Sequence, residues 1–173
     1  MISKKLITRA DIALFRQISE TVYDDVLNAI ILEAQIQDLA PLLGEKLFND
    51  ILTDTEAYAQ LLEQGEYTVD GVVYFNYGLK TVLVYYTYAR YQMFGGIIDT
   101  PFSMVEKLEG NESRPTSEKT KKDLYQMNRD NAFTVWKSVE NYLLRTNNIL
   151  FKDTYGNCHD SNNKPTFKLS KIV

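Results

Sequence analysis

The sequence has one cysteine, Cys158, and one histidine, His159, among its 173 residues. A single cysteine excludes an internal disulfide framework, so the fold depends on its core, and the composition fits a reducing compartment. A single histidine leaves general acid–base catalysis to carboxylates alone. Cys158, His159 and Asp160 are residue types that bind metals, but adjacent side chains point in different directions and no second pair of ligands occurs elsewhere. We therefore expect no metal and no cofactor.

The sequence also lacks a long apolar run and an excess of basic charge. No stretch reaches the ~18–20 apolar residues that span a bilayer, and Met1–Lys5 is not followed by the apolar run of a signal peptide. We expect that the protein does not contact a membrane. We also expect that it is made in the cytoplasm. The formal net charge of −4 argues against a dedicated nucleic-acid binder. It is compatible with a wall past which DNA slides, because acidic surfaces do not bind phosphates.

The common catalytic motifs are absent as well. The sequence contains no glycine-rich phosphate loop, no G-x-S-x-G and no H-E-x-x-H. Asp24 and Asp25 are placed to complement a helix dipole, and we expect Glu33, Gln37 and Asp38 on a solvated helix side. We therefore predict that the protein is not an enzyme.

Regular apolar spacing covers most of the chain. With 45% hydrophobic residues, one domain of this length buries about 70% of its unfolded surface. Apolar residues three and four apart predict helices near 9–18, 21–39, 42–52, 57–63, 76–94 and 117–145. We therefore predict a mainly α fold, a bundle of about five helices in residues 1–146, followed by an extended polar C-terminal tail in residues 147–173. Val26 is predicted on the core face of the second helix and Met127 on that of the last.

Several residues predict where these helices begin and end. Thr or Ser followed three residues later by an acid is typical of a capping box, and three pairs have this spacing: Thr8 with Asp11, Thr21 with Asp24, and Thr53 with Glu56. Thr116 or Ser117 is predicted to cap the last helix. Pro41 is predicted to end the second helix, because its ring removes a donor and disfavours helical Ala40. Gly44 is predicted inside the short helix that follows.

Residues 67–75 predict a β-hairpin. Tyr67–Val69 and Val72–Phe75 are β-branched and aromatic segments that flank Asp70-Gly71. Asp-Gly suits a type I′ turn, in which both central residues have positive φ. A lone hairpin is marginally stable in water, so it must pack on the helices or pair with a partner.

The predicted helix at 76–94 is apolar or aromatic on nearly every face. The chain has twelve tyrosines, and this helix contains Tyr85, Tyr86, Tyr88 and Tyr91. A helix that is apolar all round is normally buried, but a small domain has limited interior, and a neighbouring subunit can cover the remainder. Core packing and a subunit interface therefore both stay open, on different faces of one helix, with these four tyrosines as interface candidates.

Two further segments are interface candidates. Residues 95–116 are rich in Gly, Asp, Pro, Asn and Ser and predict a long loop, a feature that usually has a use, with Asp99, Pro101 and Phe102 as its candidate contacts. Residues 166–173 alternate polar and apolar side chains. This segment is either a disordered end or a strand that adds to a partner's sheet. The anchors of such a strand would be Phe167, Leu169, and Ile172 or Val173.

The order of these segments resembles the small head–tail connector proteins of tailed bacteriophages, closest to the adaptor or ring proteins of crAss-like phages. The resemblance covers about residues 1–146. It rests on the following segments: Glu33–Gln35, Asp38–Gly44, Leu47–Leu52, Tyr67–Gly71, Gly78–Lys80, Tyr88–Tyr91 and Asp99–Phe102.

The resemblance implies a structural virion protein at the portal vertex, in the neck. Such a protein forms a ring beneath the portal, typically of twelve copies, extends the DNA channel, and docks the next neck or tail component. Its partners would be itself, the portal protein, the next ring, and double-stranded DNA that passes without sequence-specific binding. The alternative is a cytosolic helical binding module, an assembly chaperone or a regulator, that acts as a monomer or dimer.

Overall fold

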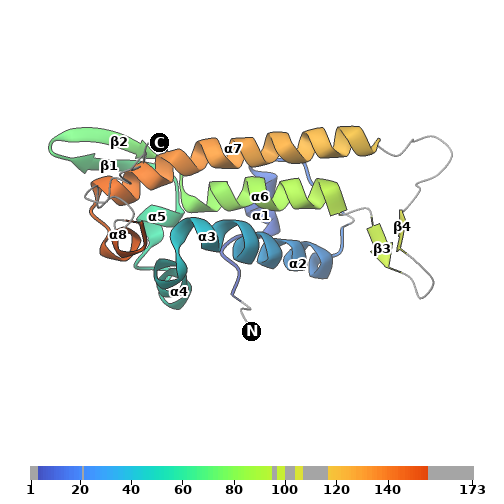
Figure 1. Ribbon diagram of the computed structural model, residues 1–173, viewed down its shortest axis with the longest axis horizontal. Coiled ribbons are helices and arrows are strands. Elements are labelled where there is room, and N and C mark those ends of the chain that lie inside the picture. The colour runs from blue at the N-terminus through green and yellow to red at the C-terminus, as the bar shows by residue number, and fades with distance from the viewer. Residues whose placement is uncertain (1–3, 21, 95–96, 100–103, 107–116, 156–173) are drawn as a thin grey trace, which may run out of the picture.

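Two long helices, α6 (Leu79–Phe94) and α7 (Glu118–Arg145), lie side by side along the molecule (Figure 1). The structure is a computed structural model that describes residues 4–20, 22–94, 97–99, 104–106 and 117–155. The remaining helical segments are α1 (Arg9–Ala13), α2 (Asp24–Ala34), the π-helical turn η1 (Gln35–Leu39), α3 (Ala40–Leu43), α4 (Glu45–Thr53), α5 (Ala59–Leu62) and α8 (Ile149–Tyr155). The strands are β1 (Gly65–Val69), β2 (Val72–Asn76), β3 (Ile97–Asp99) and β4 (Met104–Glu106). The predicted mainly α class with a hairpin is confirmed.

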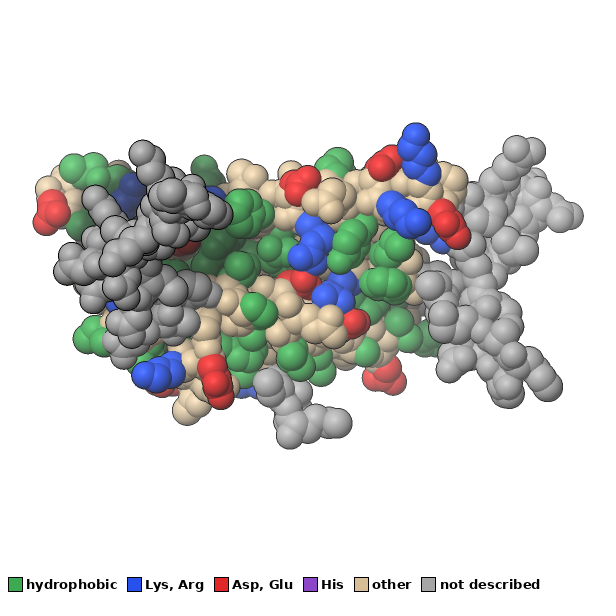
Figure 2. All heavy atoms as spheres, in the orientation of Figure 1, with side chains coloured by type: hydrophobic (Ala, Val, Ile, Leu, Met, Phe, Trp, Pro, Cys, Tyr) green, Lys and Arg blue, Asp and Glu red, His purple; other side chains and the backbone are tan. Residues whose placement is uncertain are grey.

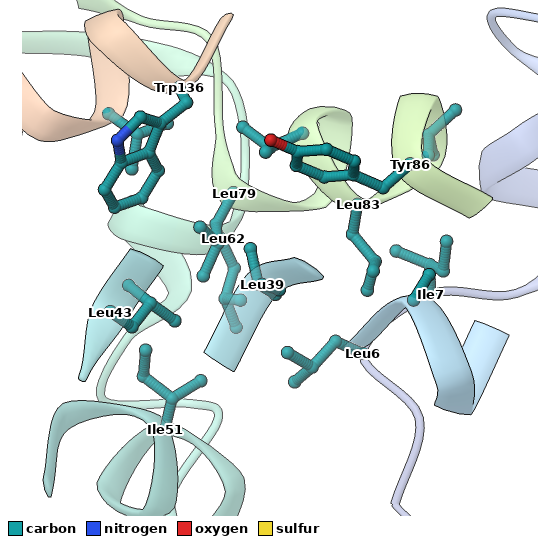
Figure 3. Close-up of a cluster of buried hydrophobic side chains, with 14 of the residues drawn as sticks. Leu6, Ile7, Leu39, Leu43, Ile51, Leu62, Leu79, Leu83, Tyr86 and Trp136 are labelled. Atoms are coloured by element: carbon teal, nitrogen blue, oxygen red, sulfur yellow. The ribbon is translucent and has the colours of Figure 1, made fainter. Parts of the chain in front are cut away.

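The core lies on both sides of α6. Leu79, Val82, Leu83, Val84 and Ala89 of this helix are fully buried, between α7 on one side and α2 with η1 on the other. Figure 3 shows their neighbours, Leu39, Leu43 and Ile51 from the early helices and Trp136 from α7, converging on one cluster. Burying each such aliphatic side chain contributes about 1.5–3 kcal/mol.

The core stripes of two helices differ from the predicted ones by one position. In α2 the buried stripe runs through Leu27, Ile31 and Ala34, and Val26 is 46% exposed. In α7 it runs through Asn128, Ala132, Trp136, Val139 and Leu143, and Met127 is 47% exposed. Both predictions for Val26 and Met127 were therefore wrong, since each side chain lies beside its stripe rather than on it.

The first helix begins at the predicted capping box. The Thr8 side chain accepts from the Asp11 amide, and the Asp11 carboxylate accepts from the Thr8 amide at 2.6 Å. Both unpaired donors at the helix start are thereby satisfied. The Ser117 side chain caps α7 by accepting from the Thr120 amide at 3.2 Å.

Replacing Thr8 by alanine is expected to lower the free energy of unfolding by about 1 kcal/mol, because the substitution removes one cap hydrogen bond. Urea denaturation followed by circular dichroism measures the difference. Thr8→Ser keeps the hydroxyl and is the matched control. A loss of equal size in both variants would mean that the threonine methyl group, rather than the cap, is responsible.

Pro41 does not end the second helix, contrary to the prediction. The helix widens by a π-helical turn at η1, where the Ala40 amide bonds to the Gln35 carbonyl five residues back. Pro41 then lies in the first turn of α3. Proline has no amide N–H, so no donor is left unpaired at this position. The helical backbone continues to Leu43 and stops at Gly44, which has φ +78°. Gly44 is therefore a junction between α3 and α4, not the interior of one helix.

The predicted cap pair Thr53 and Glu56 is also wrong. The Thr53 hydroxyl donates back to the Asn49 carbonyl at 2.9 Å, as the last residue of α4. The Asp54 carboxylate accepts from the Ala57 amide at 3.1 Å and holds the turn that leads to α5. The third predicted pair begins at Thr21, which lies outside the described residues; in α2 itself the N-terminal residue Tyr23 makes no side-chain cap.

The predicted hairpin is confirmed. β1 and β2 are antiparallel with Val69 opposite Val72, and Asp70 and Gly71 have φ of 52° and 77°, the signs that a type I′ turn requires. Its inner face packs on α7: Tyr67 stacks on Tyr74 and meets Tyr142 edge-on at 4.8 Å between ring centroids.

Two segments predicted to lack regular structure have some. β3 and β4 pair antiparallel inside the predicted loop 95–116, with Asp99 opposite Met104. α8 follows α7 and packs on α4 and α7. Asn148 precedes its first residue, and the Asn148 side chain accepts from the Phe151 amide at 3.0 Å. Phe151, which falls inside the predicted polar tail, is 2% exposed and lies against Trp136. The folded domain therefore continues past Arg145 through α8.

One described helical stretch, Asp24–Leu43, is long and apolar enough to cross a membrane by length and composition alone, although we expected no such stretch. A core helix satisfies the same criterion. Here 44% of the window is buried inside the fold, and Gln35 and Asp38 lie within it as buried polar residues.

Candidate interaction surfaces

The tyrosines of α6 are engaged within the subunit. Tyr86 is 5% exposed and belongs to the core. Tyr85 and Tyr88 are half-buried, and the Arg16 guanidinium lies over their rings at 4.8 and 5.8 Å. The Tyr88 hydroxyl donates to the Gln17 carbonyl at 3.2 Å, and its ring lies 6.1 Å from that of Tyr91. These contacts favour the core interpretation for Tyr86 and leave only partial ring surface for a partner on the other three.

A buried charge network joins three helices beside these tyrosines. Asp38 of η1, with its side chain 4% exposed, accepts from Arg90 Nε of α6 and from Arg129 Nη1 of α7, both at 2.6 Å. Arg90 also donates to Glu33 at 2.8 Å and to Gln37 at 3.0 Å. Figure 2 shows basic and acidic side chains meeting on this face between α7 and the α2–α3 helix. The prediction of a solvated side was wrong for Asp38, because its carboxylate is buried against Arg90 of α6 and Arg129 of α7.

The same network sets the electrostatics around Arg129 and Tyr86. Burial lowers the pKa of the Arg129 guanidinium, but the hydrogen bond and charge of Asp38 outweigh burial, so the pKa is raised. Burial raises the pKa of Tyr86, although the nearby Arg129 charge opposes it. Arg129 therefore stays charged and Tyr86 neutral, which suits a rigid joint better than proton transfer.

Two buried amides fix further segments. Gln35 is fully buried; it accepts from the Leu6 amide and donates to the Lys4 carbonyl, each at 3.0 Å. Asn128 of α7, 1% exposed, donates to Gln92 at 3.1 Å and accepts from Arg16 at 3.2 Å. Sequence reasoning missed both, although each lies on the apolar stripe of its own helix.

The outer face of the hairpin is the first exposed apolar surface. Val73 and Phe75 alternate along β2 on the face away from α7 and are 60% and 48% exposed. Val72 at the turn is 51% exposed, and Tyr77, 49% exposed, meets Phe75 edge-on at 5.4 Å. We call these four residues the hairpin patch.

A second exposed apolar surface lies on α1 and α2. Leu14 at the end of α1 and Tyr23 at the start of α2 are 79% and 81% exposed, and Val26 follows on the next turn. Arg9 holds these segments together, because its guanidinium donates to Asp24 and to the Ser19 carbonyl, both at 2.8 Å. We call Leu14, Tyr23 and Val26 the N-terminal patch. Exposed apolar clusters are typical of interaction sites, whereas isolated exposed apolar residues are ordinary.

The described residues hold no group of three or more metal-ligating side chains. A groove bordered by Phe15, Leu62 and Lys80 has a volume of about 180 Å³, below the ~300–1,000 Å³ of small-molecule sites.

Among the described residues, Tyr58 has the largest shift in pKa. Burial, then its 2.5 Å hydrogen bond to Asp50 and the charges of Asp50 and Asp54, raise its pKa to about 12. The folded state thus holds this proton more tightly than the unfolded state, whose pKa is near 10. That contribution to stability is complete below pH 10 and is lost as the pH rises to 12.

The free energy of unfolding of Tyr58→Phe is therefore expected to fall less steeply between about pH 10 and about pH 12 than that of the unsubstituted protein. Urea denaturation across this range measures it. Tyr86 and Tyr142, whose pKa values burial also raises, titrate in both proteins and so cancel. Identical slopes would contradict the assignment to Tyr58.

The other candidate residues are placed only in part. Asp99 is the last residue of β3, where its backbone pairs with Met104. Pro101, Phe102, Phe167, Leu169, Ile172 and Val173 lie outside the described residues, as do Cys158 and His159. The hairpin patch and the N-terminal patch were not among the sequence candidates. The hairpin patch could have been predicted from Val73 and Phe75, which alternate with other residues beside the turn.

Comparison with known proteins gives one match. A model described as a family of unknown function, DUF6712, matches residues 39–163, well over half of the chain. None of the curated proteins and none of the solved structures matches.

Proposed function

We propose that this chain, which belongs to the family of unknown function DUF6712, is a structural subunit of the head–tail connector of a tailed bacteriophage. In this proposal it forms a ring beneath the portal, typically of twelve copies, and docks the next neck or tail component. Double-stranded DNA passes through the ring without sequence-specific binding. The order of segments in residues 1–146 and the net charge of −4 support the proposal, since an acidic channel does not hold phosphates.

The observation that carries the proposal is the pair of separate apolar surfaces. A ring is built from a heterologous interface, in which one surface of each subunit meets a different surface of the next. The hairpin patch lies at one end of the long axis, and α2, with part of the N-terminal patch, lies toward the other end (Figure 1). Each patch contains a side chain at least half exposed, Val73 at 60% and Tyr23 at 81%. Two unlike patches on one subunit meet the requirement of a ring.

The first test is the mass of the purified protein by native mass spectrometry, alone and mixed with a candidate portal protein. A closed ring, formed alone or only on the portal, is the expected result. A monomer or dimer that ignores the portal would overturn the proposal and favour a helical binding module instead.

Two charged substitutions then test the interface. Phe75→Glu in the hairpin patch and Leu14→Glu in the N-terminal patch should each abolish the ring while leaving the helical circular dichroism unchanged. Mixed together, they should form a heterodimer through the one intact pair of patches, and no ring. Leu144→Glu, at an α7 position that is 47% exposed, is the control and should assemble normally. Rings that persist in both patch variants would exclude these surfaces.

A further inference from the structure

The hairpin has one covered edge and one open edge. Next to a two-residue turn, the closing pair Val69 and Val72 is hydrogen-bonded, and pairs then alternate along the ladder. Glu66 opposite Phe75 and Thr68 opposite Val73 are therefore the pairs whose amides and carbonyls face outward. On β2 this edge faces α7: the Phe75 carbonyl accepts from the Ser138 hydroxyl at 3.2 Å.

The β1 edge has no such cover among the described residues. β1 has β2 as its single strand neighbour there, and Glu66 and Thr68 are both exposed. An open edge of this kind is a template for a further strand. Proteins usually place charged residues on such an edge to prevent unwanted strand pairing. Here the charged residues are acidic, since residues 65–76 contain Glu66 and Asp70 and no Lys or Arg.

The chain itself contains a segment with the matching properties. Residues 164–173 contain Lys164, Lys168 and Lys171 and no Asp or Glu. In an extended conformation, one face of this segment would carry Phe167, Leu169, Lys171 and Val173, and the other would carry Lys164, Lys168 and Ile172. A strand added to β1 would therefore bring lysines to the acidic edge. Opposite charges on neighbouring strands stabilise their pairing.

We propose that the C-terminal segment Lys164–Val173 of one copy adds as a third strand to the β1 edge of a neighbouring copy. The donor is a neighbouring copy because the proposed ring needs each subunit to offer two different surfaces, and a basic strand and an acidic edge are such a pair; to this extent the inference rests on the proposed function. The eight residues 156–163, between α8 and this segment, can span about 26 Å when fully extended.

The first test uses a labelled peptide of residues 164–173 and the full chain with Phe167→Glu and Leu169→Glu, which disables its own segment. The peptide should bind this chain in fluorescence anisotropy, and binding should weaken with salt because lysines meet acids. Hydrogen exchange of the Glu66 and Thr68 amides should slow at least tenfold on binding. Absence of binding, or binding without this protection, would overturn the proposal.

Two substitutions in β1 locate the site. Thr68→Pro removes an amide that faces outward, so it blocks the added strand while leaving the β1–β2 ladder its bonds. Glu66→Lys reverses the charge of the edge and serves if the proline variant does not fold. Each should weaken peptide binding at least tenfold, and Glu56→Lys, an exposed position before α5, is the control and should not. Equal binding to the edge variants and the control would overturn the assignment.

The donor is tested by mixing. The segment-disabled chain and a full-length Glu66→Lys chain should each fail to self-associate through this contact but bind each other, because one supplies the edge and the other the strand. Protected Glu66 and Thr68 amides in a monomeric unsubstituted chain would instead place the strand on its own hairpin and overturn exchange between copies. Rings on the portal that persist when the segment is disabled would refute this inference and leave the proposed function standing. Peptide binding without any ring would overturn the proposed function and leave this inference standing.

Discussion

Replacing Asp38 by alanine is expected to lower the free energy of unfolding by about 3–5 kcal/mol, because it leaves buried cations without their shared partner. Arg90, with its side chain 9% exposed, would keep only Glu33 and Gln37, and Arg129 would lose its 2.6 Å carboxylate contact. Urea denaturation followed by circular dichroism and tryptophan fluorescence measures the loss. The expected mechanism is separation of α7 from the α2–η1 segment.

Glu33→Ala is the matched control for Asp38→Ala. It removes a carboxylate from the same arginine, but this carboxylate is 44% exposed, and exposed ion pairs contribute about 0–1 kcal/mol. If both variants lost the same small amount of stability, Asp38 would not be the centre of the network. A triple variant with leucine at Asp38, Arg90 and Arg129 should recover much of the loss, since apolar replacement of a whole buried ion network is often neutral.

The buried role of Asp38 could not be predicted from the sequence. It lies seven residues after Ile31 and four after Ala34, on the buried stripe of α2 and η1, so an acid in an apolar stripe was visible in the sequence. Its partners were not, because Arg90 and Arg129 are 52 and 91 residues away along the chain. Without them, solvent was the simplest partner for a carboxylate. The buried role follows only from the packing of three helices.

Local signals, in contrast, predicted local structure. The Asp70-Gly71 turn, the Thr8 capping box and the Ser117 cap are each satisfied within four residues. Prediction failed where a distant contact outweighed a local preference. Phe151 looked isolated because its ring partner, Trp136, is on another helix.

The candidate interaction surfaces follow the same division. An apolar helix such as α6 has two explanations in the sequence, core or interface, and only its position between α7 and α2 separates them. Once its tyrosines are largely occupied within the subunit, the exposed apolar surface is found on the hairpin and on α1–α2 instead. Which side of a strand faces solvent depends on where the hairpin packs, and β2 is fixed by contacts to α7 such as Ser138 to Phe75.

The placement of the hairpin depends on Gly78, and Gly78→Ala is expected to lower the free energy of unfolding by about 2–5 kcal/mol. Gly78 has φ +78°, where an alanine costs about 1–2 kcal/mol. A Cβ there would also lie 2.7 Å from the Glu63 carbonyl carbon and 2.8 Å from the Leu62 oxygen. Both are backbone atoms of the segment entering β1, and overpacking of this kind costs about 1–3 kcal/mol more.

Two other glycines separate these contributions. Gly71 also has positive φ, at +77°, but a Cβ there meets nothing within 4 Å, so Gly71→Ala should lose only the ~1–2 kcal/mol of backbone strain. Gly65 has open space and no positive φ, so Gly65→Ala should change stability by about 0.5 kcal/mol or less. Urea denaturation of the three variants should therefore rank Gly78 first, Gly71 second and Gly65 last. Equal losses of stability at Gly78 and Gly71 would mean that the hairpin can shift away from α6 without cost. The β1 edge would then not be held in one position for the strand that we propose to add to it.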